Sequence, residues 1–164
     1  MILGMTIPIF AHVLISVAGI LSGFVAGYGM LMAKRFDRWT AVFLSPTLAT
    51  SVTGFFLPAH RFLPSHAVGI ISLLVLAVAI FARYSRQLAG AWRWAYVITA
   101  MTALYLNVFV LVVQLFLKVP GLKAIAPTQS EPPFKVTQVA VLTLFALVAV
   151  IAAIRFRIEP LRTT

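Results

Sequence analysis

The chain is organised as long apolar runs separated by short polar stretches. An α-helix needs roughly 20 apolar residues to cross the hydrocarbon core of a bilayer, with a range of about 17 to 25. The pattern therefore predicts five transmembrane helices, over residues 7–33, 40–57, 66–82, 94–117 and 134–154. The expected fold is an all-α integral membrane protein, in which residues 1–164 form a single bundle of about five helices.

The polar stretches and the prolines set the expected boundaries of these helices. The first run is too long for the apolar part of a signal peptide and follows no basic stretch, so we expect it to be retained as a helix. Ser65 is well placed as the N-cap of the third helix. The longest connection, residues 118–135, contains four prolines and a glycine, and we expect an exposed loop or cap without regular structure there.

The basic residues predict the orientation of the bundle. Three Lys or Arg residues follow the first run, three follow the third run and three lie at the C-terminus, against four on the opposite side. Basic loops favour the cytoplasm, so the N-terminus is predicted outside and the C-terminus inside, in a bacterial cytoplasmic membrane. Trp39, Trp92 and Trp94 then fall at the cytoplasmic interface, where aromatic belts occur.

The overall composition excludes several classes of protein. With 62% hydrophobic and 10% charged residues, and a mean hydropathy of +1.07, a chain of 164 residues cannot hide its apolar surface in water. The net charge of +10 is attributed to topology and lipid headgroups rather than to nucleic acid, because the basic residues flank the apolar runs. The absence of cysteine excludes disulfides and thiolate chemistry.

Acidic residues are scarce and lie outside the apolar runs. Asp37, Glu131 and Glu159 are the three acids of the chain, so no carboxylate is available within the membrane for a proton or cation relay. No hydrolytic triad, metal-hydrolase motif or phosphate-binding glycine loop is present. We therefore expect no enzymatic activity.

Small and polar residues within the runs predict how the helices pack. Gly19, Gly23 and Gly27 form a stripe that lets another backbone come close, either inside the bundle, at a dimer face or against a flat cofactor. Asn107 and Gln114 share one face of the fourth helix, and Asn107 is predicted to hold helices together.

The second run has an unusual density of polar residues for a membrane span. Pro46 removes one backbone hydrogen bond, and neighbouring hydroxyls can satisfy the carbonyl that this frees. The run is either a kinked helix packed on the first one or the polar lining of a site. Its polar positions are Ser45, Thr47, Thr50, Ser51 and Thr53.

The three histidines all map to the outer end of the predicted bundle. Imidazole is a good axial ligand for haem iron and a good ligand for zinc or copper, so His12 and His66 are the candidate metal ligands. Arg61 could pair with a haem propionate, and His60 and Gln114 lie at a similar depth. The alternative is that these are solvated or hydrogen-bonded interfacial histidines.

Three functions remain open on these observations. The first is a non-catalytic accessory subunit or assembly factor, bound to a larger membrane partner or to a second copy through the first helix. The second is an electron-transfer protein that holds haem b or a quinone near the outer face. The third is a carrier for a neutral or hydrophobic solute. The pattern of short spans with histidines near one face resembles small bacterial membrane proteins that carry b-type haem and cytochrome-oxidase accessory factors, and no residue's role is taken from this resemblance.

Overall fold

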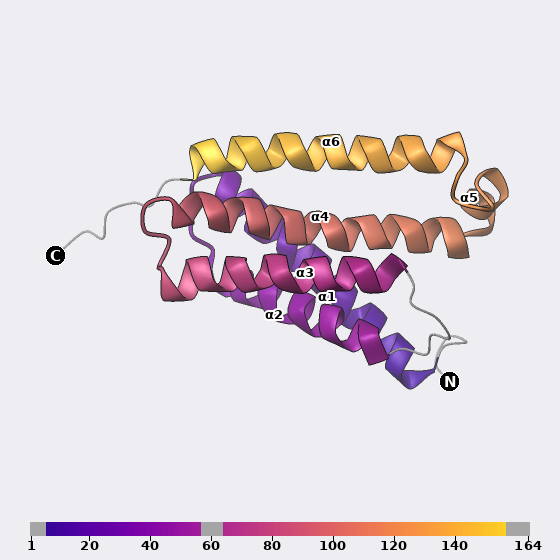
Figure 1. Cartoon of the computed structure of the whole chain (residues 1–164), viewed down its shortest axis with the longest axis horizontal. Coiled ribbons are helices and arrows are strands. Elements are labelled where there is room, and N and C mark those ends of the chain that lie inside the picture. Colours follow the sequence, from indigo (N-terminus) through magenta and orange to yellow (C-terminus); the bar gives the residue numbers. More distant parts are fainter. Residues whose placement is uncertain (1–5, 57–63, 157–164) are drawn as a thin grey trace.

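The computed structural model describes residues 6–56 and 64–156, and within these ranges the regular structure is helical throughout. The helices run in the order of their labels in Figure 1. They are α1 (Ile7–Leu31), α2 (Asp37–Thr53), the 3₁₀ turn η1 (Gly54–Phe56), α3 (Pro64–Ile80), the π-helical segment η2 (Phe81–Ser85), α4 (Trp92–Lys118), α5 (Pro120–Ile125) and α6 (Pro132–Arg155).

Four helices in the described part of the chain are long and apolar enough to cross a membrane. They are α1, α3 continued through η2, α4 and α6. α2 is also helical, but its 17 residues rise only about 25 Å, less than the roughly 30 Å of a hydrocarbon core. The predicted class, an all-helical integral membrane protein, is confirmed at this level.

The observed boundaries correct several of the expected ones. α2 begins at Asp37 rather than at residue 40, because an acidic side chain suits the positive end of the helix dipole. The prediction that Ser65 caps α3 is wrong. The helix already begins at Pro64, whose fixed φ and missing N–H suit the first helical position. α6 likewise begins at Pro132.

The connection between α4 and α6 is also more ordered than expected. It contains the six-residue helix α5, and Ala126 is fully buried in a cluster with Val112 and Phe116 of α4. The Gln129 side chain donates a hydrogen bond to the carbonyl of Val113, at 2.9 Å. Pro120 and Pro132 start α5 and α6 rather than preventing helix formation, and the segment between them folds back onto α4.

The helices form one bundle in which α1 and α2 cross the others at an angle. Figure 1 shows that α1 lies beside α6 at the end where both helices finish, and diverges from it towards its own N-terminus. We call the end where α1 begins and α4 finishes the cavity end. The opposite end, where α1 finishes and α4 begins, is the arginine end. α1 starts at the cavity end and α6 finishes at the arginine end (Figure 1).

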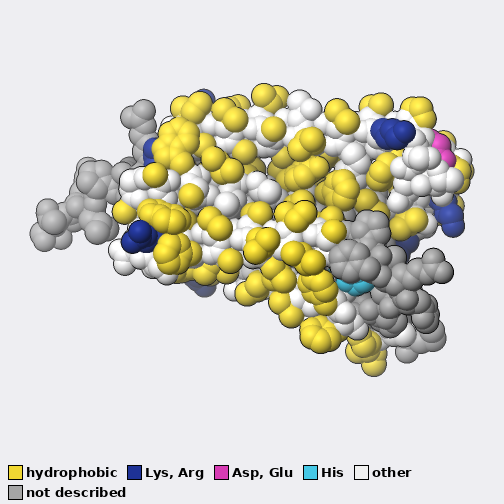
Figure 2. Space-filling view, viewed as in Figure 1, with side chains coloured by type: hydrophobic (Ala, Val, Ile, Leu, Met, Phe, Trp, Pro, Cys, Tyr) yellow, Lys and Arg dark blue, Asp and Glu magenta, His cyan; other side chains and the backbone are white. Residues whose placement is uncertain are grey.

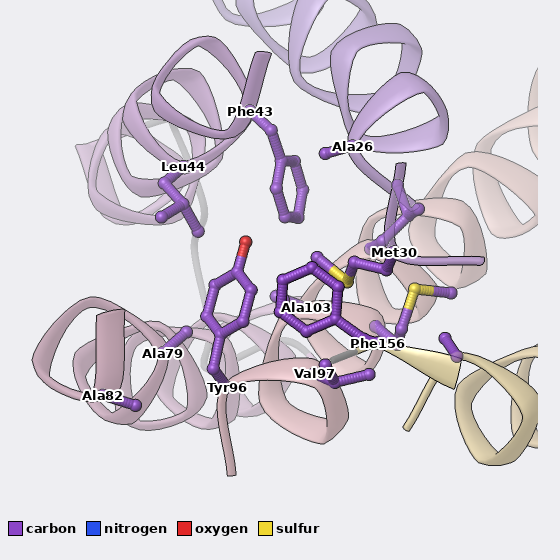
Figure 3. Packing of buried hydrophobic residues seen from close by; sticks show 14 of the residues in the cluster. Ala26, Met30, Phe43, Leu44, Ala79, Ala82, Tyr96, Val97, Ala103 and Phe156 are labelled. Atoms are coloured by element: carbon purple, nitrogen blue, oxygen red, sulfur yellow. The ribbon is translucent and has the colours of Figure 1, made fainter. Parts of the chain in front are cut away.

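The main core lies towards the arginine end and brings together residues from all five long helices. Its largest members are aromatic, and Figure 3 shows Phe43, Tyr96 and Phe156 converging between the helices with Met30 beside them. The rings of Tyr96 and Phe156 lie 6.2 Å apart, a distance typical of favourable aromatic pairs.

An ion pair closes this core. Arg83 was expected in a polar connection, but it lies within η2 and is only 4% exposed. Its guanidinium contacts the carboxylate of Asp37 and lies over the ring of Tyr96, 5.1 Å from the centroid. A buried guanidinium needs such partners, because an uncompensated buried charge is costly.

The outer surface of the bundle is apolar along its middle. Figure 2 shows hydrophobic side chains covering the central part of the visible face, with Lys and Arg at the two ends. Many large apolar residues on α1, α3 and α6 are more than 40% exposed, as lipid-facing residues would be. This distribution suits a chain surrounded by a bilayer.

Candidate functional site

A cavity of about 350 Å³ opens at the cavity end, between α1, α2, η1, α3 and α4. This volume lies at the lower end of the roughly 300–1,000 Å³ found for small-molecule sites. Its walls are mainly apolar, from residues such as Val13, Val110 and Leu111. The polar lining residues are His12, Ser16, Thr50, Ser51, His66, Ser72, Asn107, Gln114 and Lys118. None of the lining residues is acidic, so cations are disfavoured.

The position of His12 follows from its contact with α2. Its Nδ1 lies 2.9 Å from the hydroxyl of Thr53, and that hydroxyl donates its hydrogen to the carbonyl of Ala49, at 2.7 Å. The hydroxyl must therefore accept a hydrogen bond from Nδ1–H. In the neutral imidazole, Nε2 then keeps its lone pair and can accept a hydrogen bond from a ligand or coordinate a metal.

His66 reaches the cavity from the first turn of α3. It is half-buried and stacked on Phe55 of η1, with ring centroids 5.6 Å apart and the planes inclined by 25°. The Phe55 ring also covers Gly69, where a Cβ atom would come within 3.1 Å of it. The 3₁₀ turn thus places an aromatic wall between the end of α2 and α3.

The two amides of α4 line the cavity at different heights. Asn107 donates a hydrogen bond to the hydroxyl of Thr47, at 3.2 Å, and this ties α4 to α2. Gln114 lies seven residues, about two helical turns, closer to the end of α4 and is exposed. Within the described residues its side chain makes no hydrogen bond, so its amide is available to a ligand.

The glycine stripe of α1 is filled from within the chain. A Cβ atom on Gly19 would meet the Thr47 hydroxyl at 3.1 Å, and one on Gly23 would come within 2.5 Å of Leu104. A Cβ atom on Gly27 would lie 3.4 Å from the sulfur of Met101. α2 and α4 therefore occupy this face at Gly19 and Gly23, and a flat cofactor or a second copy has no room there.

Apart from the glycine stripe, the candidate residues of the sequence analysis thus divide into two groups. The structure brings His12, His66 and Gln114 to the wall of one cavity, and Asn107 joins them there while it also links two helices. His60 and Arg61 lie outside the described residues. Among the residues that the structure describes, no group of three or more His, Cys, Asp or Glu side chains could hold a metal ion.

Two polar lining residues, Ser72 and Lys118, had not been recognised from the sequence. Ser72 is 3% exposed and lies two successive steps of three residues beyond His66, with Gly69 between them, and all three line the cavity. A lone serine in an otherwise apolar run is a usable signal, because polar groups within a membrane usually face the protein interior. Lys118, at the end of α4, was counted only as a topological charge.

Comparison with known proteins adds no family: no protein-family model, no curated protein and no solved structure matches the chain. The cavity is therefore the feature from which function is inferred.

Proposed function

We propose that this chain is a five-span protein of a bacterial cytoplasmic membrane that binds a small quinone-type molecule at the cavity end. In this arrangement α2, extended by η1 to residue 56, is the fifth span, because the pair covers 20 residues. The N-terminus and the cavity lie outside, and the arginine end faces the cytoplasm, as the distribution of basic residues favours.

The observation that carries this proposal is the lining of the cavity, which is apolar with a few hydrogen-bonding groups from four different elements. Pockets of this kind bind molecules with an apolar body and a polar head. A quinone has an apolar ring and tail with two opposed carbonyl oxygens, which become hydroxyls in the quinol.

The hydrogen-bonding groups match such a head group. Nε2 of neutral His12 can accept a hydrogen bond from a quinol hydroxyl, and the Gln114 amide can donate one to a carbonyl oxygen. Neither partner is acidic, in keeping with a neutral ligand.

The geometry favours a quinone over haem b. His12 is arranged as metal-ligating histidines usually are, because its Nδ1–H donates a hydrogen bond to the Thr53 hydroxyl and the lone pair of Nε2 is left for a ligand. However, the glycines that were expected to make room for the porphyrin are covered by Thr47, Leu104 and Met101. A visible spectrum of the purified protein distinguishes the two, because a Soret band belongs only to the haem case.

The proposal is tested by titrating the purified protein with a ubiquinone that carries a decyl tail. We expect saturable binding at one molecule per chain. His12→Leu and Gln114→Leu should each weaken binding roughly two- to tenfold, because one hydrogen bond contributes about 0.5–1.5 kcal/mol. Val110→Phe should abolish binding, because the larger ring occupies the cavity.

The matched control is Val139→Phe, which makes the same change at a 61% exposed position of α6 outside the cavity lining. It should bind like the parent. Equal affinity of Val110→Phe and Val139→Phe, or no saturable binding by the parent, would overturn the proposal. The accessory-subunit and carrier hypotheses would then remain. No feature of the described residues favours either one now, because lipid alone accounts for the apolar outer surface.

A further inference from the structure

A second hollow lies further along α1, closer to the arginine end. It has a volume of about 200 Å³ and lies between α1, α4 and α6. Its lining is almost entirely apolar, from Phe24, Gly27 and Leu31 of α1, Met101 of α4, and Leu144 and Val148 of α6. We call it the α1/α6 crevice. It shares no lining residue with the cavity of the proposed site.

Basic residues follow the crevice residues along the chain on both α1 and α6, towards the arginine end. Lys34 follows Leu31 by three residues, and Arg155 follows Val148 by seven residues, a rise of about 10 Å along the helix. α1 and α6 pack against each other, and Figure 1 shows their C-terminal parts side by side, so the helix end that precedes Lys34 and the helix end that carries Arg155 form one corner of the bundle. Both side chains are exposed.

These two charges are not neutralised by the described part of the chain. Asp37 is the acid at this end among the described residues, and its carboxylate contacts Arg83 and lies 3.6 Å from Arg35. Within the same residues, neither Lys34 nor Arg155 has an ion-pair or hydrogen-bond partner through its side chain.

The guanidinium of Arg93 adds to the positive charge of this corner. It donates a hydrogen bond to the carbonyl of Phe156, just beyond Arg155. This contact joins the start of α4 to the end of α6, so the basic groups stand on two elements that are tied together.

We propose that the α1/α6 crevice binds one anionic phospholipid, with an acyl chain between α1 and α6 and the phosphate at Lys34 and Arg155. The apolar lining matches the chain, and the unpaired charges match the headgroup. Basic pockets between transmembrane helices on the cytoplasmic side are a recognised way of holding anionic lipids. This proposal does not depend on the quinone site.

The test is native mass spectrometry of the purified full-length protein with phosphatidylglycerol and phosphatidylcholine of identical acyl chains. We expect phosphatidylglycerol to bind at least about fivefold more tightly, and Lys34→Gln or Arg155→Gln each to weaken it about fivefold, as expected for one basic group near an anionic headgroup. Binding of phosphatidylcholine should not change. Glycerol phosphate without acyl chains should not compete, because the crevice contributes the apolar half of the site.

The controls are Lys123→Gln and Lys135→Gln, which remove the same charge at the opposite end of the bundle. These two variants should prefer phosphatidylglycerol over phosphatidylcholine to the same extent as the parent. Val148→Trp should weaken both lipids by filling the crevice, whereas Val110→Phe should bind phosphatidylglycerol like the parent. Equal affinity of the parent for the two lipids would overturn the proposal. It would also be overturned if the control variants Lys123→Gln and Lys135→Gln lost as much affinity for phosphatidylglycerol as Lys34→Gln and Arg155→Gln. A dimer that buries the crevice with no dependence on lipid would also overturn it.

Discussion

The two ends of the bundle are built from the same helices but are filled differently. At the arginine end, α1 and α2 face large side chains, and Phe43, Tyr96 and Phe156 are each at most 1% exposed. At the cavity end, the facing residues of α1, α2 and α3 are short, as at Ser16 and Ser72, and a cavity of about 350 Å³ remains. The size of the facing side chains therefore decides where this bundle is a filled core and where it leaves a cavity.

The acidic residues at the two ends also differ, in whether they interact with the core. Asp37 forms an ion pair with the buried guanidinium of Arg83, so this carboxylate interacts with a side chain of the core. Glu131 precedes α6 at the cavity end, where its carboxylate accepts hydrogen bonds from the hydroxyl and amide of Thr128 and from the amide of Ser130. It orders a surface turn and contacts no core residue through these bonds.

The largest effect is expected where α1 packs most closely. Gly23→Leu should destabilise the protein by about 3 kcal/mol or more, because even a Cβ atom would lie 2.5 Å from Leu104 and 2.9 Å from Phe43, both almost fully buried. Thermal unfolding in detergent measures this loss. Ala18→Leu, at an exposed position of the same helix, should unfold at the temperature of the parent.

A glycine at the cavity end sharpens this first prediction. Among the described residues, a Cβ atom on Gly54 would meet only the His12 ring, at an ordinary contact distance of 3.7 Å. Gly54→Ala should therefore change the free energy of unfolding by less than about 0.5 kcal/mol. Similar losses for Gly23→Leu and Ala18→Leu would show that the stripe is not closely packed.

The next effect compares one substitution at the two ends of a single helix. Val97→Phe should cost about 1–3 kcal/mol, because Val97 is 0% exposed in a filled core. Val110→Phe should cost less than about 1 kcal/mol, because the ring extends into existing space. Chemical unfolding in mixed micelles compares the two variants. Equal costs would mean that the cavity is closed in solution.

The smallest effect concerns pH at the turn before α6. Desolvation is the largest single influence and raises the pKa of Glu131, but the hydrogen bonds from Thr128 and from backbone amides together outweigh it, so the pKa is lower than usual for a glutamate. The turn is therefore fully stabilised above the ordinary glutamate pKa of about 4.3, and this stabilisation is lost as the pH falls through the lowered value.

NMR of the Thr128 and Ser130 amides measures this titration. We expect an inflection below the ordinary pKa of glutamate, and Glu131→Gln should remove it while the resonances of the arginine end remain unchanged. An inflection at or above the ordinary value would contradict the hydrogen bonding described for this turn.

The helical membrane class follows from the sequence because apolar run length is a local property. A helix satisfies its own backbone hydrogen bonds, so each run specifies a helix without reference to its neighbours. Short connections then force successive helices to alternate in direction, which is why His12 and His66 could be assigned to the same end. The starts at Asp37 and Pro64 lie slightly before the expected apolar runs, because a polar residue or a proline can form the first turn of a helix.

The tertiary structure decided which faces meet and what lies between them. The burial of Arg83 depends on Asp37 and Tyr96, two residues from other helices, and its own neighbours in the sequence do not indicate it. The cavity exists because short side chains from α1, α2 and α3 face one another where the helices diverge. The orientation of His12 likewise depends on Thr53, 41 residues away. Such contacts depend on helix rotation and crossing, which the packed volumes of several helices determine together.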